Sequence, residues 1–407
     1  MTASNNHVCL FCGSEIDKET VAFHSNATEN DICKNCILMC HQAMTKKKRE
    51  NRIIKKIMTP KEIKEELDKN IIGQDDAKRA IAIAVYNHYK RMDILTDVKI
   101  SKSNVLLLGP TGSGKTLIAQ TIAELLDVPF AIADATSLTE AGFVGDDVES
   151  ILLKLIQAAD GDIEKAERGI IFLDEVDKLA KTNVGTNITK DPSGEGTQQA
   201  LLKILEGTLA NVPPTGGRKN PNEKCIPFNT ENVLFICGGA FPGMEDIVNK
   251  RVNKESQTSI GFGANTEKAE VLSVGNALKE VSTEDLVAYG FIPEFIGRLP
   301  IIVSLDELNE DALIEILTKP KNSIVNQYKE LFKYDGVDLV FTPEALEEMA
   351  KDAIKNKTGA RGLRGILEKR LKDVMFSIPS NPDIEKCIID KDGKTSMKRS
   401  RNKKIAC

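Results

Sequence analysis

The spacing of hydrophobic positions changes along the chain, and each change predicts a different kind of structure. Between residues 61 and 92, apolar residues recur at helical spacing on both sides of Gly73, so we expect two helices joined by a turn. From residue 104 the chain shifts to short apolar runs separated by amphipathic stretches. The four runs are NVLLLG (104–109), PFAIAD (129–134), GIIFLDE (169–175) and NVLFICGG (232–239). Strands that alternate with helices predict a parallel sheet covered on both faces.

The strand pattern fades beyond about residue 305, where amphipathic helical stretches occupy residues 310–332 and 343–356. We therefore expect an α/β domain followed by a smaller, mostly helical domain. The last residues are basic and lack periodicity, which predicts a disordered tail. The predicted segments are a cysteine module at 1–45, a basic linker at 46–60, the sheet domain at 61–305, the helical domain at 306–385 and the tail at 386–407.

Composition narrows the class of protein. With 407 residues, of which 41% are hydrophobic, the chain can form two or three domains with sizeable cores. No run approaches 18 apolar residues, and the first residues have neither the charge nor the apolar core of a secretory signal. We therefore expect a cytoplasmic protein that does not cross a membrane. The net charge of -5 argues against a chain that binds nucleic acid along its whole surface.

Four of the nine cysteines form two close pairs, Cys9 with Cys12 and Cys33 with Cys36, and 20 residues separate the pairs. This spacing is typical of structural Zn²⁺ sites, in which four thiolates bind the ion tetrahedrally. Plain buried thiols or a disulfide framework are the alternatives, and the lack of a secretion signal disfavours disulfides. Because a module of about forty residues builds little core, we expect the metal to supply its folding free energy.

The segment GPTGSGKT at 109–116 follows one apolar run and opens an amphipathic stretch, which is the context of a phosphate-binding loop. Its glycines let backbone N–H groups surround the β- and γ-phosphates of ATP at the positive end of the next helix. Lys115 would neutralise phosphate charge, and the Thr116 hydroxyl would bind Mg²⁺. A chance glycine-rich turn is the alternative. The predicted nucleotide-binding residues in this segment are Pro110, Thr111, Gly112, Ser113, Gly114, Lys115, Thr116 and Leu117.

Two acids, Asp174 and Glu175, end the apolar run GIIFL. Ligands bind beyond the carboxyl ends of the strands in open parallel sheets, so both acids should face the phosphates. Asp174 would hold Mg²⁺, and Glu175 would polarise the attacking water. An exposed acidic turn is the alternative, but it leaves the pairing with the phosphate loop unexplained. The sequence therefore predicts an ATPase whose catalytic residues include Lys115, Asp174 and Glu175.

The motifs GPTGSGKT, GIIFLDEVDK, PEFIGRLP and KTGARGLR, preceded by a four-cysteine module, resemble the ClpX family of AAA+ protein unfoldases. The similarity runs from the first cysteine to about residue 380. It implies that Arg298 is an arginine finger, which reaches the γ-phosphate held by a neighbouring subunit; a plain surface arginine is the alternative. It also implies that Arg361 contacts the nucleotide of its own subunit. Ile71 and Ile72 match the adenine-pocket segment of the family, although core packing fits them equally well.

Three further segments acquire a role only through this resemblance. The family assigns substrate-gripping loops to a central channel, and the matching residues are Phe143, Val144, Lys190, Arg218 and Lys219. In GFVG, the aromatic ring would grip any polypeptide by apolar contact, and local packing is the alternative. Asn220 stands where the family has a histidine at the channel entrance, which leaves the preference for substrate tags open.

The tripeptide Ile260-Gly261-Phe262 resembles the loop that docks the family onto the ClpP peptidase ring; a loop that folds back on its own domain is the alternative. The resemblance also implies a homohexamer, with the zinc module binding adaptors or substrates. One expected element is missing, because Cys237 and Gly238 stand where many AAA+ proteins place a polar sensor residue.

The sequence thus predicts an unfoldase that uses ATP, Mg²⁺ and Zn²⁺ and feeds unfolded or tagged proteins to ClpP. No protease-type catalytic constellation is recognisable, so we expect unfolding without cleavage. An AAA+ nucleic-acid motor or clamp loader is the alternative, because it would share the phosphate loop and the arginine finger. Its broad basic face is absent from this net-acidic chain, so we expect no nucleic-acid partner.

Overall fold

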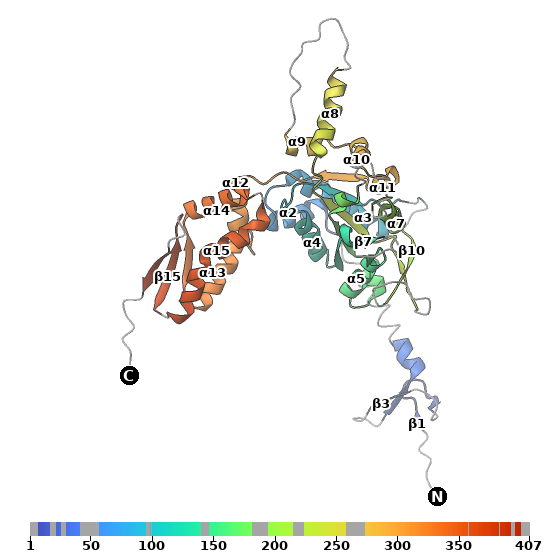
Figure 1. Ribbon diagram of the computed structural model, residues 1–407. Helices are drawn as coiled ribbons and strands as arrows, with labels where there is room; N and C mark the ends of the chain where they lie inside the picture. Colours follow the sequence, from blue (N-terminus) through green and yellow to red (C-terminus); the bar gives the residue numbers. More distant parts are fainter. Residues whose placement is uncertain are drawn as a thin grey trace, which may run out of the picture. The chain divides into compact units, whose positions relative to one another are not determined.

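The computed structural model describes most of the chain (Figure 1). The described residues are 7–16, 22–25, 30–40, 57–94, 98, 100–139, 146–180, 194–214, 224–257, 273–356, 358–381, 383–391 and 395–399. The chain divides into two compact units, Met1–Ile57 and Met58–Cys407. None of the helices in the described ranges combines the length and the apolar character that a membrane span requires.

The first unit is built from two small hairpins and one helical segment. Strand β1 (His7–Val8) pairs antiparallel with β2 (Glu15–Ile16), and β3 (Ala22–Ser25) pairs antiparallel with β4 (Asn30–Cys33). Residues 34–40 are helical. The buried core of this unit consists of three cysteines, with Ile16 and Ile32 packed against them. So small an apolar core cannot stabilise a fold by itself.

The second unit contains a five-stranded sheet in which all the strands are parallel. In spatial order the strands are β13 (Ile301–Ser304), β5 (Val105–Leu108), β12 (Leu234–Gly239), β9 (Ile170–Asp174) and β6 (Phe130–Asp134). Four of them coincide with the predicted apolar runs, which confirms the parallel α/β domain. The fifth, β13, lies at the edge next to β5 and was not among the predicted strands.

Each strand of this sheet carries apolar residues on both faces, as the unbroken apolar runs require. In β5, Val105 and Leu107 belong to one hydrophobic cluster, and Leu106 and Leu108 belong to another. The first cluster is formed with α2 (Pro60–Asn70), α3 (Asp75–Asp93) and α4 (Lys115–Leu126). The second is formed with α5 (Ser150–Ala158), α7 (Glu195–Glu206) and the helices that follow β12. The sheet is therefore covered on both faces.

Shorter elements complete the sheet domain. They are the 3₁₀ turns η1 (Ala135–Ser137) and η2 (Val176–Leu179), the helices α6 (Ile163–Ala166), α8 (Met244–Gln257), α9 (Val274–Lys279), α10 (Thr283–Tyr289) and α11 (Pro293–Gly297), and the strand pairs β7 (Leu138–Thr139) with β8 (Asp146–Asp147) and β10 (Leu209–Val212) with β11 (Ile226–Asn229).

The C-terminal part of the second unit is a smaller domain in which four helices pack on a three-stranded sheet. The helices are α12 (Glu310–Thr318), α13 (Ile324–Tyr334), α14 (Pro343–Lys355) and α15 (Ala360–Ser377), followed by the 3₁₀ turn η3 (Ile378–Ser380). The strands are β14 (Asp338–Phe341), β15 (Ile384–Ile389) and β16 (Thr395–Arg399). Strand β15 lies between the other two, parallel to β14 and antiparallel to β16.

The prediction of a disordered tail from residue 386 is wrong. Ile384, Cys387 and Ile389 of β15 are at most 3% exposed and belong to the core of the small domain. The basic charge of the last residues concealed this short strand, whose apolar side chains have no obvious period because the register shifts between Ile384 and Lys386. Residues 400–407 lie outside the described part of the chain.

Candidate functional site

The phosphate-binding loop lies between β5 and α4, as the sequence predicts. The loop leaves the carboxyl end of β5 after Leu108, and α4 begins at Lys115. Gly114 forms the N-cap of α4 in the left-handed region, with φ of 102°. The loop therefore ends at the N-terminus of a twelve-residue helix, where free backbone N–H groups favour an anion.

Lys115 is buried beneath this loop and holds it closed. Its Nζ donates hydrogen bonds to the carbonyl oxygens of Gly109 at 2.6 Å and Pro110 at 3.1 Å. Burial lowers the pKa of Lys115 to about 8, although the carboxylate of Asp174 opposes this shift. The ammonium group is thus mostly charged at neutral pH, but it is poorly solvated. A phosphate would provide it with a stronger partner than the two carbonyls.

The two predicted acids lie at the carboxyl end of β9, beside the phosphate loop. Asp174 accepts a hydrogen bond from the Glu175 N–H at 3.0 Å and lies 3.4 Å from the Thr116 hydroxyl oxygen. Glu175 adopts the left-handed backbone conformation, with φ of 56°. For a glutamate this conformation costs about 1–2 kcal/mol. Such strain is typical of functional sites, because the surrounding fold has to impose it.

The small domain contributes directly to this site through the N-terminus of α15. A Cβ atom on Gly112 would lie 3.0 Å from the carbonyl oxygen of Thr358, and one on Gly359 would lie 3.2 Å from the carbonyl oxygen of Thr111. Two residues later, Arg361 places Nη2 3.9 Å from Asp174 Oδ2. The phosphate loop and α15 are therefore in direct contact at a seam between the two domains.

These residues surround a cavity of about 280 Å³. Lys115, Asp174, Glu175 and Arg361 line it, so both charges needed for phosphate chemistry face one space. Two residues before Lys115 in the loop, Ser113 has a buried hydroxyl oxygen without a hydrogen-bond partner among the described residues. A buried hydroxyl without a partner is costly, and a bound ligand could satisfy it. The residues present therefore fit a nucleotide with its divalent cation.

Close packing excludes a larger side chain at Gly238, one of the two residues that stand at the expected sensor position, and at the neighbouring Gly239. A Cβ atom on Gly238 would lie 2.7 Å from the Phe172 ring, and one on Gly239 would lie 2.7 Å from Asp177 Oδ1. The buried Asp177 instead accepts a hydrogen bond from the Ala240 N–H at 3.2 Å and lines the cavity. Sequence reasoning missed Asp177, although it stands within the quoted run GIIFLDEVDK.

Ile71 and Ile72 do not line the cavity described above. Ile71 is buried in the hydrophobic cluster that includes α2 and α4, so its adenine-binding role stays a prediction. Their neighbour Gln74 was missed. Its side-chain amide exchanges two hydrogen bonds of 2.8 Å with the backbone of Asp306, between the sheet domain and the small domain. Gln74 thus fixes the start of the interdomain connection.

Arg298 lies far from the cavity of its own chain. It follows α11 and precedes β13, and its carbonyl oxygen accepts a hydrogen bond from Asn104, just before β5 begins. Because β5 and β13 are parallel, Arg298 belongs to the amino end of these strands, whereas the phosphate loop follows their carboxyl ends. Four residues of strand separate the two ends by roughly 13 Å. The side chain of Arg298 is half exposed.

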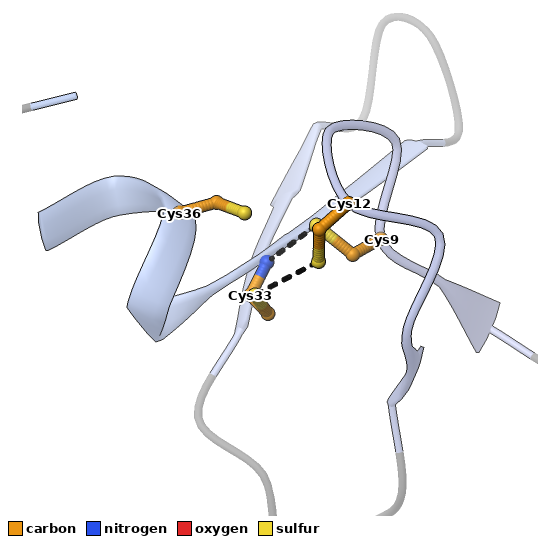
Figure 2. Close-up of side chains that lie close together, drawn as sticks. All are labelled: Cys9, Cys12, Cys33 and Cys36. Atoms are coloured by element: carbon orange, nitrogen blue, oxygen red, sulfur yellow. Dashed lines mark hydrogen bonds between the residues drawn. The ribbon is translucent and has the colours of Figure 1, made fainter. Parts of the chain in front are cut away.

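The four predicted metal ligands converge in the first unit (Figure 2). The Sγ atoms of Cys9, Cys12, Cys33 and Cys36 all lie within 4.8 Å of one another. Cys9 and Cys12 come from the loop between β1 and β2, Cys33 ends β4, and Cys36 lies on the helical segment that follows. Cys40 is exposed and is not part of this cluster.

Hydrogen bonds favour the thiolate form of two of the four cysteines, Cys9 and Cys12. The Cys33 N–H donates to Cys9 Sγ at 3.3 Å, and this contact is the main cause that lowers the pKa of Cys9 to about 6. A hydrogen bond with Ser14 lowers the pKa of Cys12. Neighbouring sulfur atoms, Cys12 first, raise the pKa of Cys36 instead. Four thiolates cannot share so small a space without a cation, so the donor set fits a soft divalent ion.

The residues assigned to the channel and to peptidase docking lie outside the described part of the chain. They are Phe143, Val144, Lys190, Arg218, Lys219, Ile260, Gly261 and Phe262. Their roles stay predictions.

Comparison with known proteins agrees with this architecture. Residues 100–302 match the AAA domain (Cdc48 subfamily), and residues 308–388 match the C-terminal, D2-small domain, of ClpB protein. Two relatives, from Borrelia duttonii (strain Ly) and Borrelia recurrentis (strain A1), are ATP-dependent Clp protease ATP-binding subunits ClpX. Each is 52% identical to the chain over 394 residues, covering 94% of this chain and 90% of the relative.

The chain belongs to the ClpX family. As a ClpX-family member it is an AAA+ ATPase that binds ATP, which confirms the predicted family and enzyme class. The second domain match ends at residue 388, within β15, and so agrees with the corrected end of the small domain.

The contact between Gly112 and Thr358 gives a first prediction. Alanine at position 112 would have φ of 83° and a Cβ atom 3.0 Å from the Thr358 carbonyl oxygen, so the loop or the seam must shift. We expect Gly112→Ala to raise the Kd for ATP about tenfold, as a loss of about 1.4 kcal/mol does. Titration with a fluorescent ATP analogue measures this.

The matched control is Gly365→Ala, because Gly365 lies within α15 and a Cβ atom there would meet no neighbour within 4 Å. This variant should bind ATP normally and gain up to about 1 kcal/mol in stability. Equal ATP affinity in both variants would show that the seam does not support the nucleotide loop.

Proposed function

We propose that the chain is an ATP-driven protein unfoldase that acts as a homohexameric ring and passes substrates to the ClpP peptidase. The observation that carries this proposal is the 52% identity, over 94% of the chain, to ATP-binding subunits of the Clp protease. The separation of Arg298 from the ATP site of its own subunit supports the proposal independently, because an arginine at this position can act on the ATP of a neighbouring subunit when subunits assemble.

In each subunit the nucleotide is held by the phosphate loop, with Lys115 moving from the carbonyls of Gly109 and Pro110 to the phosphates. Thr116 and Asp174 would hold Mg²⁺, which, when bound, neutralises the charge that develops on the phosphates. Glu175 orients and polarises the attacking water. Arg361 links this chemistry to the small domain, because its side chain comes from α15.

The second half of the active site comes from a neighbouring subunit. Arg298 lies at the amino ends of β5 and β13, whereas its own phosphate loop follows the carboxyl end of β5, so the two are on opposite sides of the sheet. In a ring of identical subunits, the amino edge of one sheet can meet the carboxyl edge of the next. There the Arg298 guanidinium would stabilise the charge of the transferring phosphoryl group.

The GFVG loop transmits the resulting motion to a substrate chain. Both of its ends are anchored, because β7 and β8 pair on either side of it, and Leu138 and Val148 are buried in the core of the sheet domain. A force on Phe143 therefore passes to the domain that binds ATP. Lys190, Arg218 and Lys219 would attract acidic segments toward the same channel.

Two other segments would make contacts with partners. Ile260, Gly261 and Phe262 would dock onto ClpP, and each loop binds weakly alone but gains strength because six act together. The zinc module would bind adaptors or substrates, with Zn²⁺ held by Cys9, Cys12, Cys33 and Cys36. When bound, Zn²⁺ replaces the missing hydrophobic core of this unit as its source of stability.

The unfolding activity itself can be tested on a stable fluorescent protein that carries an unstructured tag. We expect fluorescence to fall only when ATP is present, and we expect Phe143→Ala to slow this loss at least tenfold while ATP hydrolysis stays within about twofold. Phe143→Tyr keeps the ring and serves as the matched control. If DNA, and not unfolded protein, stimulates hydrolysis, the chain is a nucleic-acid motor and the proposal fails.

The shared active site predicts complementation between inactive subunits. Arg298→Ala should bind ATP but not hydrolyse it, and Lys115→Ala should fail to bind it. Mixed rings should regain activity, because a Lys115→Ala subunit supplies an intact Arg298 to a neighbour with an intact phosphate loop. Steady-state phosphate release across mixing ratios measures this. Absence of activity at every ratio would contradict a shared site.

The zinc site predicts that Cys9→Ser releases the metal and unfolds the first unit. Elemental analysis of the purified protein should show zinc at background level, whereas Cys40→Ser, outside the cluster, should keep it. ATP hydrolysis should persist in both variants, because the ATP site lies wholly within the second unit. Wild-type protein that contains no zinc when freshly purified would refute the metal assignment.

A further inference from the structure

The side chain of Arg298 has one partner in its own subunit, and that partner has no assigned role. Arg298 Nη2 donates to Glu206 Oε1 at 2.5 Å. Glu206 is the last residue of α7, and its side chain is 41% exposed. The rest of the guanidinium makes no hydrogen bond within the described part of the chain, so one edge of it is bound and the other is open to a ligand.

A buried amide connects the backbone of Arg298 to that of Leu205, the residue directly before Glu206. Asn104 is 1% exposed, and its Nδ2 donates to the carbonyl oxygens of Arg298 at 2.9 Å and Leu205 at 3.2 Å. Its Oδ1 accepts from the Phe235 N–H at 3.4 Å. Asn104 directly precedes β5, the strand that leads to the phosphate loop. The relative position of Arg298 and Glu206 is therefore set by the central strands of the sheet.

Side-chain hydrogen bonds also fix the C-terminal end of α7. Of its last carbonyl oxygens, that of Lys203 accepts from the Thr208 hydroxyl at 3.0 Å, and that of Ile204 accepts from Lys102 Nζ at 3.4 Å. With the bond from Asn104 to Leu205, three consecutive carbonyls are satisfied by side chains. Glu206 thus projects from a rigid support, although its own side chain lies near the surface.

Helix stability does not explain an acid at this position. The C-terminal end of a helix carries a partial negative charge, so a carboxylate in the last turn is unfavourable there. Within the described part of the chain, Arg298 is the single ion-pair partner of Glu206 that offsets this cost. Glu206 is thus an acidic residue at the unfavourable end of a helix, and its partner is the arginine that we propose to act in hydrolysis in trans. This pairing points to a role for Glu206 in that reaction.

We propose that Glu206 is a positioning residue for Arg298: it binds one edge of the guanidinium and directs the other edge toward the nucleotide of the neighbouring subunit. The proposal rests on the trans role of Arg298. The pair does not lock the arginine, because an ion pair between half-exposed side chains is weak and leaves the rest of the guanidinium free to turn toward a polyphosphate. Because Glu206 orders the Arg298 side chain before the reaction, less conformational entropy is lost on reaching the transition state.

The test compares Glu206→Ala with Glu206→Gln in steady-state ATP hydrolysis by the full-length protein. Glu206→Ala should lower kcat about fivefold, the factor that corresponds to a well-formed exposed ion pair, and leave KM for ATP within about twofold. Glu206→Gln keeps an oxygen that accepts the hydrogen bond from Nη2, so it should retain most of the activity. Lys203→Ala, an exposed change on the same helix, is the matched control and should hydrolyse ATP at the wild-type rate.

A mixing experiment separates positioning from a structural role. Lys115→Ala subunits keep the Glu206–Arg298 pair, so they should restore hydrolysis at the intact phosphate loops of Glu206→Ala subunits. A merely structural defect would remain in the mutated subunit and would not be rescued. An equal fall in Tm for the alanine and glutamine variants, with equal loss of kcat, would also indicate a structural role and overturn the proposal.

Failure of this inference can be told from failure of the proposed function. If Arg298→Ala is inactive while Glu206→Ala hydrolyses ATP at the wild-type rate, Arg298 acts without Glu206 and only the positioning role is lost. A kcat above the wild-type value for Glu206→Ala would show that Glu206 competes with the phosphate, which also overturns positioning. If Arg298→Ala itself keeps the wild-type kcat, the shared active site fails, and the inference fails with it.

Discussion

The common direction of the five sheet strands is the constraint on which the rest of this structure depends. Parallel strands put all their carboxyl ends on one side of the sheet, and there the phosphate loop follows β5, Asp174 ends β9 and Glu175 follows it. The same geometry leaves Arg298 at the opposite edge, at the start of β13. A single sheet therefore has the residues of the ATP site at the carboxyl ends of its strands and Arg298 at the amino ends. Under the proposed function, assembly of subunits brings the two together.

The second constraint is the contact between the phosphate loop and α15. Gly112 and Gly359 have no side chains at the point where the two backbones meet, and this allows Arg361 to approach Asp174. A change in the bound nucleotide would therefore alter the contacts at the N-terminus of α15, a helix of the small domain. Gln74 fixes the connection at Asp306 from the other side. We propose that these contacts make the angle between the two domains depend on bound ATP.

The first and second units differ in the source of their stability. Among the described residues of the first unit the buried ones are mainly cysteines, so apolar burial contributes little, and under the proposed metal assignment a bound ion supplies the stability. The sheet domain, in contrast, buries two large clusters of aliphatic and aromatic side chains on opposite faces of its strands. The loss of metal and the loss of nucleotide should therefore disturb different units of the chain.

Much of this organisation was readable from the sequence, because the relevant signals are local. The apolar runs predicted four of the five sheet strands, the two cysteine pairs predicted the four-cysteine cluster, and the order of strand, glycine-rich loop and helix predicted the ATP site. Local signals failed at β15, where the basic charge of the last residues outweighed the buried Cys387 and Ile389 in our interpretation, and at β13, which was not recognised as a strand.

Only the tertiary structure decided how distant segments meet. Nothing in the residues around Glu206 or Asn104 indicates that they hold Arg298, because 92 and 194 positions along the chain separate them from it. The approach of Arg361 to Asp174, and the exclusion of any side chain at Gly238 by Phe172, likewise depend on packing between elements. Sequence patterns report on periodicity and on the chemistry of neighbouring residues. Which side chains share a space is set by the packing of the whole sheet against its helices, and this is a non-local property of the chain.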